Sequence, residues 1–215
     1  MPSSSQFPLL GSQTTGFGGN LPNGANQSWN NLFNSVSDNG ANTTTANPLT
    51  SSNGATYFLK NQQYGHSIPS DATIDGIELL VERAQGGGFY SDYEVRVSGS
   101  PGMSSSKTAD IGASWATTGV ATYGGPTDLW GLSWSASDVN STLFSTYVSV
   151  TGTSPLNPAT AGLDYVKTIV YYTEAGGGGG DDGPDFNIKI GGQSISRIMM
   201  GSQPVGRTFF GSQDI

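Results

Sequence analysis

Short blocks of β-branched and aromatic residues, set between clusters of Gly, Asn and Ser, constrain the fold of this chain more than any other feature. Within residues 74–83, Ile77, Leu79 and Val81 alternate with two glutamates and a leucine. Such a period of two is typical of a strand with one buried face and one solvated face. Good helix formers are not concentrated in any long amphipathic run. The pattern therefore predicts an all-β protein.

Further strands are expected where the same residue types recur. The sequence predicts them at 93–98, 120–123, 147–151 and 165–173. The last is the longest β-branched and aromatic block, so it is expected to lie centrally in a sheet. The three glycines at 86–88 predict that the strand at 93–98 returns antiparallel to the strand at 74–83.

The segment 128–141 breaks the alternation and predicts a crossover loop. Within it, Ser135 is expected to cap one short helical turn that carries Asp138 in its first turn. Two dipeptides, Asn39-Gly40 and Asn53-Gly54, are of the type that tolerates positive φ and so predict tight turns.

Composition excludes several classes of protein. Charged residues make up only 11% and hydrophobic residues 34%, yet nine Tyr, nine Phe and four Trp supply bulky core material, so the chain should fold. A net charge of −8 argues against a direct nucleic-acid partner, because neutralising phosphates needs clustered Lys and Arg. Without cysteine there are no disulfides. The sequence shows no basic leader with an apolar stretch and no apolar run long enough for a membrane span.

The chain is expected to divide into four parts. Residues 1–14 are predicted as an N-terminal arm and residues 15–174 as an antiparallel, jelly-roll-like β-sandwich. Residues 175–185, rich in Gly and Asp, are predicted as a linker because they have few side chains to pack. Residues 186–215 form a short C-terminal β-repeat.

The C-terminal repeat has a period of ten residues. Gly191, Gly201 and Gly211 stand at equivalent positions, and a Gln and an apolar residue recur in the same register. Each unit is expected to form a brief apolar strand, a Gly-containing turn and a return. The three strands are predicted at 188–190, 198–200 and 208–210.

So small a meander exposes too much apolar surface to be stable alone, so it should dock or oligomerise. Residues 1–185 hold five basic and 15 acidic side chains, a net charge of −10, whereas residues 186–215 carry +2. Opposite charges favour contacts between copies, which predicts a homo-oligomer such as a trimer. The predicted assembly residues are Ile190, Ile195, Arg197, Ile198, Met200, Val205, Arg207, Phe209 and Phe210.

The sequence offers no convincing catalytic constellation. His66 is the only histidine and lies in a loop that enters a strand, where a turn or packing role is favoured over catalysis. A Gly-x-Ser-x-Gly elbow is absent. The acidic pairs Asp71 with Asp75 and Glu78 with Glu82 are expected on a solvent face rather than across a cleft. We therefore expect no enzyme activity and no cofactor.

Two binding alternatives stay open. Trp115, Trp130 and Trp134 could form a stacking platform for a sugar, although core or interface anchoring is favoured for them. The cluster Asp181, Asp182 and Asp185 could collect Ca²⁺, but a Gly-rich linker preorganises it poorly and the EF-hand spacing is absent, so no metal site is predicted.

Several segments resemble a jelly-roll-like domain of tailed-bacteriophage virion proteins. The runs are 68–83, 123–132 and 163–172, and the resemblance covers most of residues 15–173. As in that family, Trp29-Asn30-Asn31 precedes the turn Asp38-Asn39-Gly40. The ten-residue repeat also resembles the Gly-turn repeats at the ends of phage structural and tail-fibre proteins.

This resemblance implies a virion structural protein at the particle surface, with other virion proteins as partners and no catalytic residues to carry over. Tail fibre, head decoration and tail accessory roles all fit. The alternative is a carbohydrate-binding or host-receptor-binding β-sandwich module, which would need neighbouring Trp rings exposed to solvent.

Overall fold

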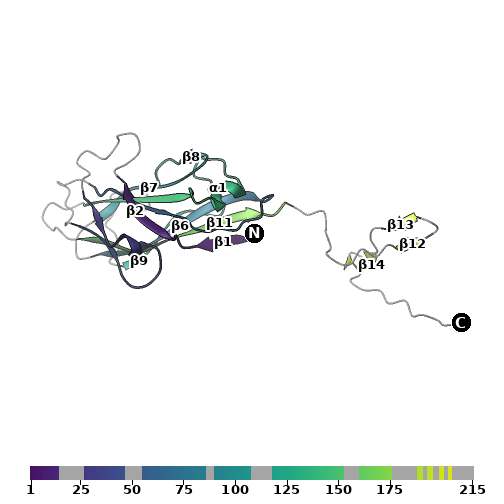
Figure 1. The fold of residues 1–215 in the computed structure, drawn as a ribbon, viewed down its shortest axis with the longest axis horizontal. Coiled ribbons are helices and arrows are strands. Elements are labelled where there is room, and N and C mark those ends of the chain that lie inside the picture. The colour runs from purple at the N-terminus through teal and green to yellow at the C-terminus, as the bar shows by residue number, and fades with distance from the viewer. Residues whose placement is uncertain are drawn as a thin grey trace. The chain divides into compact units, whose positions relative to one another are not determined.

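The computed structural model describes residues 1–14, 27–46, 55–85, 90–107, 118–152 and 160–175, together with four short strands beyond residue 187. The chain forms two compact units, Met1–Ala175 and Gly176–Ile215 (Figure 1). We call them the body and the tail and describe each by itself. No helix among the described residues is long and apolar enough to cross a membrane.

The body is an antiparallel β-sandwich, which confirms the predicted all-β class. The strands of its first sheet are β1 (Ser3–Gln6), β3 (Trp29–Asn30), β4 (Thr43–Thr45), β6 (Thr73–Gln85), β9 (Thr118–Gly124) and β11 (Ala161–Thr173). Their order is β3-β4-β11-β6-β9, and β1 also pairs with β11. The closing strand β11 is therefore central, as predicted.

The second sheet packs against the first. Its strands are β2 (Leu10–Thr14), β5 (Phe58–Gln62), β7 (Tyr90–Gly99), β8 (Gly102–Met103) and β10 (Ser145–Gly152), in the order β2-β5-β10-β7-β8. Along the chain, successive strands from β4 onward mostly change sheets, which is compatible with the predicted jelly-roll-like connectivity.

The core lies between the two sheets. From β6, Ile77, Leu79 and Val81 are fully buried, as their alternation predicted. They face Val95 of β7 and Val148 of β10 within one apolar cluster. Burial of each such side chain stabilises the fold by about 1.5–3 kcal/mol.

The predicted antiparallel return of one strand onto its predecessor at residues 86–88 is wrong. β6 pairs with β11 and β9, whereas β7 pairs with β10 and β8 in the other sheet. The crossing has a physical reason: each strand has one apolar face, and placing the strands in facing sheets turns both faces toward the same core.

Residues 1–14, predicted as an arm, belong to the body. They form β1, which pairs with β11, and β2, which pairs with β5. The N-terminal segment thus contributes an edge strand to both sheets. Its low apolar content gave no signal of strand pairing, because a short edge strand buries little side-chain surface.

The crossover loop contains the predicted capped turn, the helix α1 (Ala136–Asn140). Ser135 and Asp138 form a capping box, in which the Ser135 hydroxyl accepts from the Asp138 N–H and the Asp138 carboxylate accepts from the Ser135 N–H.

Gly124, the last residue of β9, has φ +73, and a Cβ there would lie 2.3 Å from the Ile77 carbonyl oxygen. Only glycine fits this position.

The tail contains two short hairpins. They are β12 (Ile188–Ile190) with β13 (Gln193–Ile195), and β14 (Met199–Met200) with β15 (Gln203–Pro204). The strand predicted at 188–190 is present, and of the one predicted at 198–200 the described residues Met199–Met200 form a strand. The returns of these two repeat units are strands too, so each of the two is an antiparallel strand pair. The strand predicted at 208–210 lies outside the described residues.

Candidate functional site

Two of the three tryptophans considered for sugar stacking are buried. Trp130 is 1% exposed and Trp134 is 8% exposed. Their indole N–H groups donate inside the protein, Trp130 to the Ile77 carbonyl at 2.8 Å and Trp134 to the Leu129 carbonyl at 3.0 Å. Buried rings cannot stack on a sugar, so both are core anchors. Trp115 lies outside the described residues.

The tail brings some of the predicted assembly residues into hairpins. Ile190 lies in β12, Ile195 in β13 and Met200 in β14. Ile195 pairs with Ile188 across the first hairpin. The other predicted assembly residues lie outside the described part of the chain: Arg197, Ile198, Val205, Arg207, Phe209 and Phe210. Asp181, Asp182 and Asp185 of the acidic cluster also lie outside it.

His66 has the packing role that its loop position predicted. Its ring is 4% exposed and stacks on Tyr64 with centroids 6.1 Å apart. Nδ1 lies 2.9 Å from the Ser4 hydroxyl and Nε2 lies 2.9 Å from the Thr168 hydroxyl. Burial lowers the pKa of His66 to about 4, which makes it a weak base at neutral pH. The ring therefore links Ser4 of β1 to Thr168 of β11.

A buried ion pair crosses between the sheets. Nη2 of Arg83 in β6 lies 2.9 Å from both carboxylate oxygens of Asp92 in β7 and also donates to the Tyr123 hydroxyl. β7 carries one extra residue, Tyr93, where Ser149 and Val150 of β10 face Glu94 and Asp92, and this bulge goes with the inward position of the Asp92 side chain. The sequence did not reveal this pair because its partners come from different sheets.

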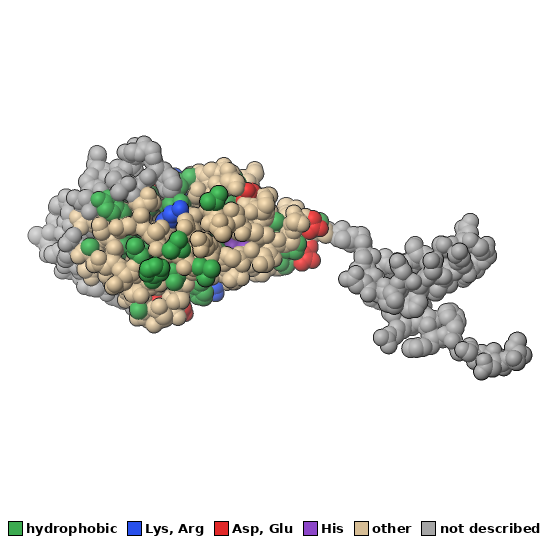
Figure 2. Space-filling view, viewed as in Figure 1, with side chains coloured by type: hydrophobic (Ala, Val, Ile, Leu, Met, Phe, Trp, Pro, Cys, Tyr) green, Lys and Arg blue, Asp and Glu red, His purple; other side chains and the backbone are tan. Residues whose placement is uncertain are grey.

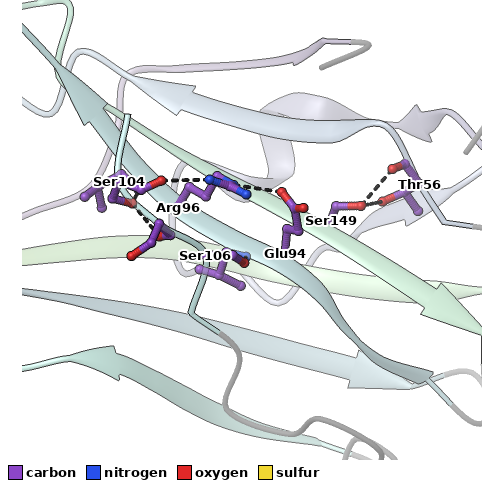
Figure 3. Close-up of polar contacts among 9 residues, drawn as sticks. Thr56, Glu94, Arg96, Ser104, Ser106 and Ser149 are labelled. Atoms are coloured by element: carbon purple, nitrogen blue, oxygen red, sulfur yellow. Dashed lines mark hydrogen bonds and ion pairs between the residues drawn. The ribbon is translucent and has the colours of Figure 1, made fainter. Parts of the chain in front are cut away.

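A polar network covers the outward side of the second sheet (Figure 3). Arg96 Nε donates to a Glu94 carboxylate oxygen at 2.7 Å, and its Nη1 donates to the Ser104 carbonyl at 2.8 Å. Nearby, Ser149 donates to the Thr56 carbonyl at 2.8 Å. The bonds from Arg96 to Ser104 and from Ser149 to Thr56 hold neighbouring segments to the second sheet.

Three carboxylates gather on the outward side of the first sheet. Oxygens of Asp38, Glu82 and Asp164 all lie within 4.8 Å of one another. Asp164 is only 6% exposed and accepts the Gly40 N–H at 3.0 Å, which fixes the predicted turn at Asn39-Gly40. Burial and then the charges of Asp164 and Asp38 raise the pKa of Glu82. Carboxylate oxygens suit Ca²⁺, so a hard cation could bind here.

Half-buried aromatic rings lie beside this cluster. Because Val166 and Val170 face the core, Tyr165, Lys167 and Tyr171 of β11 face outward. Phe7 packs edge-on against Tyr165, with centroids 5.5 Å apart, and Lys167 Nζ lies 5.0 Å from the Phe7 ring centroid. The body face in Figure 2 likewise shows hydrophobic side chains among mostly uncharged polar atoms, with few charged groups.

The chain matches no family model, and no curated protein or solved structure was found to be similar to it. Neither the carboxylate cluster nor the outward aromatic rings were singled out from the sequence. Their members are far apart in the chain, and the only available signal was the alternation that turns Tyr165, Lys167 and Tyr171 to one face.

Proposed function

We propose that this chain is a non-enzymatic structural subunit that acts by assembly, with the body as an outer module and the tail as the element that joins copies. The observation that carries the proposal is the tail itself, a separate unit of two short hairpins in ten-residue register. Two-stranded sheets of two or three residue pairs are too small to be stable in water by themselves. They need apolar partners, and the tails of other copies carry the same apolar residues.

Charge supports the same proposal. Residues 1–185 carry −10 and residues 186–215 carry +2, so the charge repulsion between copies is concentrated in residues 1–185 and does not extend to the repeats. The resemblance to phage virion proteins supplies the proposed setting, the surface of a virion, where the subunit would serve as fibre, decoration or tail accessory protein and help attach the particle.

Light scattering tests the assembly role. The full-length chain is compared with a version that ends at Thr173 and retains the body, at several concentrations. We expect the full-length chain to contain more copies per particle than the truncated chain. Equal copy numbers at all concentrations would contradict assembly through the tail. The variant Met200→Asp, which places a charge in β14, should lower the copy number of the full-length chain without changing the thermal midpoint of the body.

A second candidate function is recognition of a surface glycan. It is favoured by the outward rings of Tyr165 and Tyr171, because aromatic rings beside carboxylates suit the faces and hydroxyl groups of sugars. The Tyr171 hydroxyl donates to Glu78 at 2.7 Å, which holds that ring in place. Glycan-array binding by the native chain, lost in Tyr165→Ala and kept in Phe33→Ala, would support this function. Phe33 is a suitable control because it is 67% exposed.

A further inference from the structure

Within the part of the chain that the structure describes, the first sheet ends at β9, which pairs there only with β6. Among the described strands at sheet edges, β9 is the longest, with seven residues. The edge strands β3 and β8 have two residues each, and β1 has four. β2 has five, two fewer than β9.

The edge of β9 has backbone groups available for pairing. Gly125 N–H donates to the Ile77 carbonyl, so the residues of β9 with the same parity bond to β6. The N–H and C=O groups of Val120 and Thr122 consequently point away from β6. Both residues are exposed, Val120 to 49%. Sheet edges of this kind pair readily with another strand.

The composition of β9 identifies the occupant. Residues 118–125 contain no charged side chain and no proline, the features that usually block edge pairing. Glu78 and Glu82 belong to β6, one strand further into the sheet. Since copies of an acidic body repel one another elsewhere, an uncharged strand is the place where two bodies can approach, and a charged foreign peptide would find no complementary charge there.

We propose that two copies of this chain pair through β9, antiparallel, about a two-fold axis at Ala121. Val120 then bonds with Thr122 of the second copy and Thr122 with Val120 of the second copy, while the two Ala121 residues face each other as a non-hydrogen-bonded pair. The two first sheets become one continuous sheet. This contact lies in the body and is independent of assembly through the tail.

A strand-edge contact buries less than the roughly 1,200 Å² of a stable interface, so the pair is weak and is best detected by cross-linking. The chain has no cysteine, so a single Ala121→Cys is a clean probe. Its Cα atoms would be about 4.5 Å apart across the two-fold axis, which suits a disulfide. The matched control is Leu143→Cys, which is 69% exposed and lies outside the strands.

The experiment follows disulfide-linked dimer formation in the full-length chain under mild oxidation. We expect Ala121→Cys to cross-link about tenfold faster than Leu143→Cys, because pairing raises the effective concentration of the thiols. Adding Val120→Lys or Thr122→Lys to Ala121→Cys should return the rate to that of the control. Equal rates at the two cysteines would overturn the proposal, and so would rates that neither lysine lowers. Circular dichroism under reducing conditions verifies that each variant is folded.

Failure of this pairing is distinguishable from failure of the proposed tail assembly. Removal of the residues after Thr173 tests whether the number of copies per particle depends on the tail, and it leaves β9 intact. The cysteine comparison changes only β9 and leaves the tail intact. Each result therefore overturns one proposal without deciding the other.

Discussion

Ser4, in the first strand of the chain, lies 2.9 Å from the buried ring of His66, which is held on its other side by Thr168. Thr168 belongs to β11, the strand with which β1 pairs. One neutral ring thus connects the N-terminal strand, the central strand and the loop that carries His66. The free energy of this connection depends on the ring remaining unprotonated.

Stability should fall at acidic pH because of His66. Burial lowers its pKa to about 4 from 6.5, so as pH falls the unfolded chain takes up the proton first. The contribution of this group is complete above pH 6.5 and is lost as pH falls through about 4, by roughly 3 kcal/mol. Denaturant unfolding at several pH values measures this loss. His66→Gln does not titrate and should show a flatter profile; parallel profiles would refute the assignment.

Asp92→Asn should destabilise the body by about 3 kcal/mol, because it removes the carboxylate that balances the buried Arg83 guanidinium. The matched control is Glu94→Gln. It breaks the Arg96–Glu94 pair, whose side chains are 25% and 21% exposed, and should cost less than about 1 kcal/mol. Urea denaturation of both variants measures the difference. Similar losses for the two would show that burial of the first pair has no energetic consequence.

Trp134→Ala should destabilise the body by about 3 kcal/mol or more, since it removes a buried ring that packs on Phe144 with centroids 5.5 Å apart. Phe33→Ala, at an exposed position, should change stability by less than about 0.5 kcal/mol. Thermal and urea unfolding give both values. A Trp134→Ala protein of normal stability would mean that this ring is not a core anchor.

Glu82→Gln should stabilise the body modestly at neutral pH. The pKa of Glu82 is raised by burial and by the charges of Asp164 and Asp38, so its ionised form is disfavoured in the folded state. That penalty is absent below the unfolded pKa and grows as pH rises through the folded pKa. The gain should therefore disappear in acid. Unfolding free energies of the native chain and the variant, measured at pH 7 and in acid, test the sign; a gain that persists in acid has another cause.

Local patterns were sufficient for the longer strands β6, β7, β9, β10 and β11, but not for short strands such as β1 and β2. The alternation of Ile77, Leu79 and Val81 identified β6 and its buried face, and Ser135 with Asp138 identified the capped turn. These features depend on neighbours within a few residues, so the sequence contains their cause. The same holds for the ten-residue spacing of the tail, which placed its first strands.

The partners of those strands were decided only by the tertiary structure. Whether β7 pairs with β6 or crosses to the other sheet depends on how all apolar faces share one core, and no local pattern encodes that choice. The Arg83–Asp92 pair, the Ser4–His66 contact and the cluster of Asp38, Glu82 and Asp164 all join residues from separate elements. The sequence by itself determined where the longer strands β6, β7, β9, β10 and β11 lie and which face of β6 is apolar. Only the packing of the two sheets decided which side chains meet, because those contacts form between strands that are distant in the chain.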